Sequence, residues 1–300
     1  MKKVIIILGP TASGKSDMAM RLAEHLKTEL ISADSMQIYR GMDIGTAKPS
    51  REEQARVKHH MIDIVDVDEP FTVADFQEKA FKCIDSLHNY NMSPVVVGGT
   101  GLYINSLVYD LDFTQTTSDT EFRRKAEAEA AEKGSRALHE RLKKLDAAAA
   151  ARIHPNDEKR IIRRLEVLEN EGKGEKPYDF LRPREGLDYR LFGMSFPREV
   201  LYDRINRRVD IMMEQGLEGE AAALYAKYSD TPTAMKAIGY KEIIDYMKGD
   251  ISRDEAIRLI KQNSRHYAKR QLTWFRRNER IVWLDAQEKN CFKNLITGIE

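Results

Sequence analysis

Short apolar runs alternate with amphipathic segments over the first hundred residues. Four such runs lie at residues 4–8, 30–34, 60–65 and 94–97. Runs of this length that stop at glycine or aspartate are typical of buried strands in a parallel sheet. Between them, residues 16–27 and 71–89 place apolar side chains at helical spacing. This alternation predicts an α/β core in which a parallel sheet is flanked by helices.

The pattern changes near Asp110. Residues 121–168 are rich in Ala, Glu, Lys, Arg and Leu and contain no good strand. We predict that one helix ends at Gly134 and the next starts at Ser135, and that a later helix runs from Asn156 to Gly172.

These segments predict a helical insertion domain over residues 113–186. Residues 1–112 and 187–300 would then form the α/β core. Within the second part, residues 189–194 and 280–286 read as strands that return to the sheet. The chain between these two strands, from Pro197, is expected to be mostly helical.

Composition narrows the class of protein. A chain of 300 residues with 42% apolar residues can bury a substantial core, and a net charge of +1 gives no overall signal for nucleic acid. Two cysteines, Cys83 and Cys291, fit a reducing compartment and exclude a disulfide framework or a multi-cysteine zinc site. The first apolar run is too short for a membrane span, so we expect a cytoplasmic protein without membrane association.

The segment GPTASGKS follows the first predicted strand and opens the first predicted helix. It fits G-x-x-x-x-G-K-[ST], the phosphate-binding loop of nucleotide-binding and ATP-binding proteins. Its amides and the helix N-terminus favour anions, its lysine adds a charge, and its serine can ligate Mg²⁺. We expect a diphosphate or triphosphate to bind Gly9, Pro10, Thr11, Ala12, Ser13, Gly14, Lys15 and Ser16, with Ser16 as the metal ligand.

The strand at 94–97 runs into GGTGLY and lacks the terminal acid that usually helps to hold Mg²⁺ in motors and GTPases. The residues alone are consistent with two interpretations of the function: a small-molecule kinase, or an enzyme that holds a diphosphate leaving group. Asp34 ends the second strand, beside the phosphate loop, and can accept a proton from a nucleophile there. Gln37, close behind, can form two hydrogen bonds with an adenine edge.

Eight segments together resemble the tRNA dimethylallyltransferase family, and they span most of the chain. They are GPTASGKS, ISADSMQIYRGMDIGTAKP, HHMIDIVDVDEPFTVADF, PVVVGGTGLYINSL, NDEKRIIRRLEV, LYDRINRRVDIMMEQGLEGE, KAIGYKE and YAKRQLTWFRR. The resemblance implies transfer of a dimethylallyl group from dimethylallyl diphosphate to the exocyclic amine of the tRNA adenosine just 3′ of the anticodon. The chain has no Cys/His cluster near residue 300, which favours the bacterial type over eukaryotic members with a zinc finger.

The resemblance also implies roles for individual residues. The catalytic group would be Asp34, Thr100, Lys15, Arg204 and Arg208, with one of the two arginines at the diphosphate. The tRNA anticodon stem-loop would contact Asp34, Ser35, Met36, Gln37, Thr100, Arg123, Glu158, Lys159, Arg160, Ile161 and Ile162. We expect Mg²⁺ as the cofactor and a monomeric enzyme.

Two basic segments support an RNA substrate. Residues 264–280 carry Lys and Arg interleaved with aromatic side chains, and residues 152–164 are also basic. The same residues could instead form a solvated basic helix face. The alternatives are an adenylate isopentenyltransferase that accepts free AMP, a small-molecule kinase, and an RNA-binding regulator without activity.

Overall fold

The computed structural model describes residues 2–111, 119–171, 182–228 and 233–300. The chain divides into two compact units, one formed by Met1–Asp110 with Pro183–Glu300 and the other by Leu111–Arg182. The predicted insertion spans residues 113–186, so the two boundaries of this unit in the structure lie two and four residues earlier than predicted. We refer to the two parts as the core unit and the helical unit.

A six-stranded sheet forms the centre of the core unit, in the order β3-β2-β4-β1-β5-β6, and every pairing is parallel. Its strands are β1 (Lys2–Leu8), β2 (Leu30–Ala33), β3 (His59–His60), β4 (Val95–Gly98), β5 (Leu187–Ser195) and β6 (Val282–Asp285). The predicted α/β class is confirmed. The helical unit interrupts the chain before β5, so β1 pairs with strands from both parts of the sequence.

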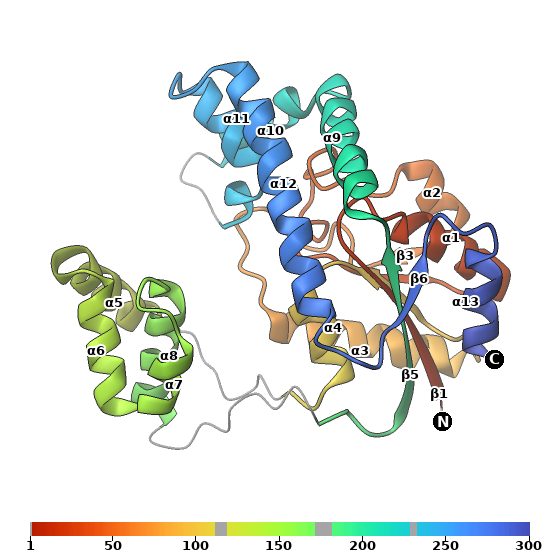
Figure 1. Ribbon diagram of the computed structural model, residues 1–300, viewed down its shortest axis with the longest axis horizontal. Helices are drawn as coiled ribbons and strands as arrows, with labels where there is room; N and C mark the ends of the chain where they lie inside the picture. The colour runs from red at the N-terminus through yellow and green to blue at the C-terminus, as the bar shows by residue number, and fades with distance from the viewer. Residues whose placement is uncertain (1, 112–118, 172–181, 229–232) are drawn as a thin grey trace. The chain divides into compact units, whose positions relative to one another are not determined.

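Helices cover the sheet and extend beyond it (Figure 1). In the core unit they are α1 (Lys15–Leu26), α2 (Arg51–Arg56), α3 (Val73–Asn89), α4 (Gly101–Val108), α9 (Arg198–Glu214), α10 (Leu217–Lys227), the short 3₁₀ helix Thr233–Lys236, α11 (Tyr240–Met247), α12 (Arg253–Phe275) and α13 (Cys291–Ile299). On one face of the sheet, Ile5 and Ile7 pack with Leu22 of α1 and Leu295 of α13. This apolar face anchors α1, whose N-terminus ends the phosphate loop.

A second hydrophobic cluster lies among α9–α12 and the segment after β2. It buries Ile38 and Met42 of that segment against Leu217, Tyr240 and Ile260. This packing brings helices from the last third of the chain next to the residues that follow Asp34.

The helical unit contains α5 (Thr120–Lys133), α6 (Ser135–Leu145), α7 (Ala147–Arg152) and α8 (Glu158–Glu171). Leu138, Leu142, Ile161 and Leu165 form its small core. The predicted break at Gly134 and start at Ser135 are confirmed, and α8 begins two residues after the predicted Asn156. The predicted stop at Gly172 lies outside the described residues.

The predicted strand at 60–65 is wrong after His60. Met61 and Asp63 have φ angles of 65° and 54°, a left-handed conformation that ends regular β-structure. Only Val65 pairs again, through an isolated bridge with Tyr39. None of the helices in the described ranges is long and apolar enough to cross a membrane.

Candidate active site

The phosphate loop turns sharply between β1 and α1. Gly14 has a φ angle of 75° and caps α1, a conformation that favours glycine. At Gly9, an added Cβ would lie 2.9 Å from Ser13 Oγ and 3.0 Å from the Met194 carbonyl oxygen. Both glycines are therefore needed for a loop this tight.

Three side chains from two parts of the chain hold the loop in place. Lys15 Nζ donates to the Pro10 carbonyl oxygen at 3.1 Å. Arg204 Nε of α9 donates to the Ala12 carbonyl oxygen at 2.8 Å, and its guanidinium lies 4.7 Å from the centre of the Phe196 ring. Arg208, one helical turn later, reaches Thr11 Oγ1 at 3.3 Å. The structure thus places both predicted arginines at the loop.

Two buried cations, Lys15 and Arg208, lie at the loop. Burial lowers the pKa of Lys15 from 10.5 to about 8, and the nearby Arg208 charge adds to the shift, while Asp34 opposes it. Burial also lowers the pKa of Arg208. Asp17 and Asp34 offset part of this effect at Arg208. Two buried cations that repel each other still favour an anionic ligand, because such a ligand offsets both the desolvation and the mutual repulsion.

Asp34 directly follows β2, and hydrogen bonds fix the orientation of its carboxylate. Its Oδ1 accepts hydrogen bonds from the backbone N–H groups of Met36 at 2.9 Å and Gln37 at 3.4 Å. Thr100 Oγ1 accepts from the Ser35 N–H at 3.0 Å and donates to Ser35 Oγ at 3.3 Å. The chain after β2 is thereby tied to the chain after β4, and the carboxylate orientation is fixed.

The Gln37 side chain is already engaged within the protein. Its Oε1 accepts from Ser32 Oγ at 3.0 Å, and its Nε2 donates to the carbonyl oxygens of Thr46 at 3.3 Å and Ala47 at 3.2 Å. These contacts use the groups that would pair with an adenine edge. Gln37 therefore shapes the wall of the site, and base pairing by this side chain would require those bonds to break.

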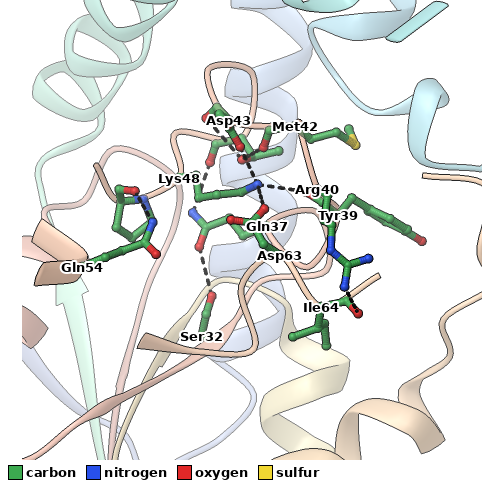
Figure 2. A network of polar contacts seen from close by, with 12 residues as sticks. Ser32, Gln37, Tyr39, Arg40, Met42, Asp43, Lys48, Gln54, Asp63 and Ile64 are labelled. Atoms are coloured by element: carbon green, nitrogen blue, oxygen red, sulfur yellow. Dashed lines mark hydrogen bonds and ion pairs between the residues drawn. The ribbon is translucent and has the colours of Figure 1, made fainter. Parts of the chain in front are cut away.

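Lys48 stabilises the same loop from the other side. Figure 2 shows its amine between Asp43, Asp63 and Tyr39. It lies 2.6 Å from Asp43 Oδ1, 2.5 Å from Asp63 Oδ1 and 2.8 Å from the Tyr39 carbonyl oxygen, and its side chain is only 3% exposed. The loop from Asp34 to Lys48 is consequently fixed by internal polar contacts rather than by regular secondary structure.

A cavity of about 360 Å³ joins these groups. Its wall includes Thr11, Lys15, Ser16, Asp34, Gln37 and Arg208. Thr100 and Arg204 are not on the wall, but each is bonded to a segment that contributes to it. The geometry therefore brings a phosphate-binding loop and a carboxylate onto the wall of one cavity.

Five residues of α12 also line the cavity, among them Tyr267 and Gln271, which were not assigned to the site from the sequence. Burial raises the pKa of Tyr267 to about 12, with Asp34 contributing and Thr100 and Gln271 opposing. Gln271 is 6% exposed and contacts the phosphate loop. Both residues lie in the segment YAKRQLTWFRR, whose basic and aromatic residues favour an RNA-binding interpretation and give no local indication of a role for the glutamine.

The residues of the helical unit that were predicted to contact RNA differ in exposure and in their partners. The side chains of Ile161 and Ile162 are 0% and 5% exposed and pack in the unit's core. Lys159 and Arg160 are exposed on α8, and Glu158 beside them is half-buried. Arg123 forms a two-pronged ion pair with the buried Glu166, at 2.8 and 2.9 Å. Its guanidinium therefore has a structural partner within the unit.

The sheet order, the phosphate loop after β1 and the acid after β2 place the chain among α/β enzymes with a phosphate-binding loop. The model of the IPP transferase family matches residues 37–278, and the chain belongs to that family.

Known proteins are similar over nearly the whole chain. The tRNA dimethylallyltransferase of Alkaliphilus oremlandii is 51% identical over 298 residues, which cover 98% of this chain and 95% of the relative. The crystal structure of the tRNA isopentenylpyrophosphate transferase from Bacillus halodurans is 44% identical, with a TM-score of 0.73, and the match covers 99% of this chain and 96% of that one. A eukaryotic dimethylallyltransferase acting on tRNA is 28% identical, with a TM-score of 0.83, over 99% of this chain and 78% of its own.

Proposed function

We propose that the protein transfers a dimethylallyl group from dimethylallyl diphosphate to the exocyclic amine of the tRNA adenosine just 3′ of the anticodon. The observation that carries this proposal is the single cavity lined by both Asp34 and the phosphate loop. The relatives named as tRNA dimethylallyltransferases support this choice of donor and acceptor.

The donor's diphosphate would lie against Lys15, Ser16 and Arg208. Negative charge gathers on the diphosphate as the bond to the allylic carbon breaks. Fixed positive groups therefore stabilise the transition state more than the ground state. Because Arg204 holds the loop backbone and Arg208 contacts the Thr11 side chain, little reorganisation is needed when the donor binds.

Asp34 would act on the acceptor. The adenine amine is a weak nucleophile because its lone pair is delocalised into the ring. As the amine nitrogen bonds to the allylic carbon, the carbon–oxygen bond to diphosphate breaks and one amine proton passes to the Asp34 carboxylate. Both described hydrogen bonds to this carboxylate fall on Oδ1, so Oδ2 can receive the proton.

Magnesium fits the oxygen groups on the wall. In the described part of the chain, no cluster of three or more His, Cys, Asp or Glu side chains could hold a metal by itself. Mg²⁺ commonly keeps several waters and shares its coordination with substrate phosphates, so the Ser16 hydroxyl would suffice as a protein ligand. When bound, the cation supplies positive charge beside the diphosphate.

Exposed basic side chains offer a surface for the RNA backbone. In the core unit, α12 presents Lys269 and Arg270, and Arg276 follows it. In the helical unit, α8 presents Lys159 and Arg160. Charged side chains of this kind position phosphates without reading sequence. All lining residues of the cavity come from one unit of one chain, so a monomer would suffice. Action in the cytoplasm is supported by the tRNA substrate and by the two cysteines of the protein, which are not paired in a disulfide.

A transfer assay tests the proposal. Radiolabelled dimethylallyl diphosphate and Mg²⁺ are incubated with unmodified tRNA in one tube and with AMP in a second. Label in tRNA alone supports the proposal, and label in AMP alone assigns the adenylate reaction instead. No label in either tube contradicts both, and hydrolysis of a nucleoside triphosphate with a small acceptor would favour a kinase.

A further inference from the structure

Gln271 connects two loops that lie far apart in sequence. Its Oε1 accepts a hydrogen bond from the Thr11 backbone N–H at 2.9 Å, and its Nε2 donates to the Gly99 carbonyl oxygen at 2.9 Å. The side chain lies on α12 and is 6% exposed. A buried amide that satisfies one donor and one acceptor on different loops is costly to replace, because both partners would be left unpaired.

The amide orientation follows from its partners. A backbone N–H can only donate and a carbonyl oxygen can only accept, so the opposite placement of Oε1 and Nε2 would set donor against donor and acceptor against acceptor. Gln271 therefore bridges the phosphate loop and the Gly99 loop in one defined orientation.

Gly99 is shaped to receive this amide. A Cβ added at Gly99 would lie 2.2 Å from Gln271 Nε2, far inside contact distance. The φ angle of Gly99 is not in the left-handed region, so its backbone conformation alone would accept alanine. Gly101, two residues on, similarly admits Trp274 of α12, whose ring would lie 2.3 Å from an added Cβ. The glycines on either side of Thr100 thus allow α12 to approach this loop closely.

The bridge continues to the carboxylate. Thr100 follows Gly99 directly and accepts a hydrogen bond from the Ser35 N–H at 3.0 Å, and Ser35 follows Asp34. The Thr100 N–H also donates to the Ala33 carbonyl oxygen at 3.2 Å. A continuous set of hydrogen bonds therefore runs from the phosphate loop through Gln271 to the segment that carries Asp34. Because the Thr11 backbone N–H donates to Gln271, this N–H is not free to donate to a phosphate.

We propose that Gln271 is a positioning residue that sets the separation between the phosphate loop and Asp34, and so between donor and acceptor. This inference rests on the proposed function. A change in that separation lowers the rate of the bound complex, because reacting groups must be held within a fraction of an ångström of attack geometry. It leaves the separate binding of each substrate largely intact, because Lys15, Arg208 and the RNA-binding surface are unchanged.

The first test uses Gln271→Met, which keeps the length of the side chain and removes both hydrogen bonds. We expect kcat to fall by about 30-fold, with KM for dimethylallyl diphosphate and Kd for tRNA changed by less than about threefold. The matched control is Gln262→Met on the same helix, whose side chain contacts Arg258 outside the cavity and whose activity should equal that of the wild type. An unchanged kcat, or a KM that rises as much as kcat falls, would overturn the proposal.

The second test is a double-mutant cycle between Gly99 and Gln271. Gly99→Ala should lower kcat at least about tenfold in the wild-type background but less than about threefold in the Gln271→Ala background, where the clash with the amide is gone and only the 3.2 Å contact with the Gly9 carbonyl oxygen remains. Additive losses would overturn the proposed bridge.

The cycle is repeated on urea unfolding, which needs no substrate. Coupling in unfolding with no transfer by the wild type would retain the bridge and reject the proposed function. Additive unfolding with active wild type would reject the bridge alone.

Discussion

The Tyr240 hydroxyl donates a hydrogen bond of 2.6 Å to Glu220 Oε1. The same carboxylate accepts the backbone N–H groups of Asp43, Ile44 and Gly45 at 2.8–3.0 Å. An added Cβ at Gly45 would lie 2.6 Å from the Tyr240 ring, so this glycine permits the close approach. Burial and the Glu220 charge both raise the pKa of Tyr240. Helices α10 and α11 thereby clasp the loop that follows Asp34.

Removing this carboxylate should destabilise the protein much more than removing the hydroxyl. Glu220→Ala leaves three loop amides and a buried hydroxyl without their acceptor, and we expect a loss of about 3 kcal/mol in the free energy of unfolding. Tyr240→Phe removes one bond while Gly45 still binds the carboxylate, and should cost about 1 kcal/mol. Urea unfolding of both variants measures the difference. Equal losses would mean that the clasp acts only through the tyrosine.

Lys48 should contribute to stability although its partners are partly exposed. Lys48→Met leaves two carboxylates and the Tyr39 carbonyl without their shared donor, and we expect a loss of about 2 kcal/mol. The matched control is Lys82→Met, which removes an exposed ion pair with Glu78 and should leave the urea midpoint unchanged. Urea midpoints of the two variants decide the question. Indistinguishable midpoints would contradict the role assigned to the Lys48 network.

Asp34→Asn tests the proposed base without disturbing the loop. The amide oxygen can still accept from Met36 and Gln37, but it cannot take a proton. We expect kcat to fall by about 10²-fold or more, with tRNA affinity changed only slightly. Single-turnover transfer measures the first quantity and filter binding the second. A rate close to wild type would remove Asp34 from the chemistry.

The lowered pKa of Lys15 predicts how diphosphate affinity depends on pH. The protonated amine binds the anion, so affinity should hold below about pH 8 and weaken as pH rises through that value. Calorimetry with dimethylallyl diphosphate from about pH 7 to about pH 9.5 tests this. Lys15→Arg is the control, because its charge does not titrate in this range and its affinity should stay level. Parallel profiles for both proteins would place the titration elsewhere.

The exposed basic residues of α8 should contribute to RNA affinity through phosphate contacts alone. Lys159→Ala should weaken tRNA binding and reduce the slope of log K against log salt by about one. The buried neighbour Ile161→Val serves as the control and should leave both quantities unchanged at temperatures where the unit is folded. An unaltered salt dependence in Lys159→Ala would exclude this part of α8 from the RNA surface.

The elements with strong local signals could be predicted from the sequence. The first strand, the phosphate loop and α1 follow from five apolar residues, two glycines and a helical apolar stripe, because local physics determines each of them. Gly134 likewise marks the boundary between α5 and α6.

The rest depends on contacts between distant residues. Nothing in the HMIDIV segment signals that Met61 and Asp63 leave the β-region, since the reason is partly the Lys48 amine fifteen residues earlier in the chain. Gln271 contacts Thr11 across 260 positions, and no local pattern around either residue predicts the pair. The resemblance assigns Ile161 and Ile162 to RNA binding, and the structure places their side chains in the core of the helical unit.

The proposed reaction passes a five-carbon group from diphosphate to a single adenosine within one cavity. Two anticodon stem-loops test this most directly. One carries adenosine beside the anticodon on the 3′ side and the other carries guanosine there. The wild-type enzyme, dimethylallyl diphosphate and Mg²⁺ are incubated with each, released diphosphate is quantified, and nuclease fragments are weighed by mass spectrometry. We expect one dimethylallyl group on that adenosine for each diphosphate released, and no reaction with guanosine. Modification of another nucleotide, or diphosphate release without modification, would contradict it.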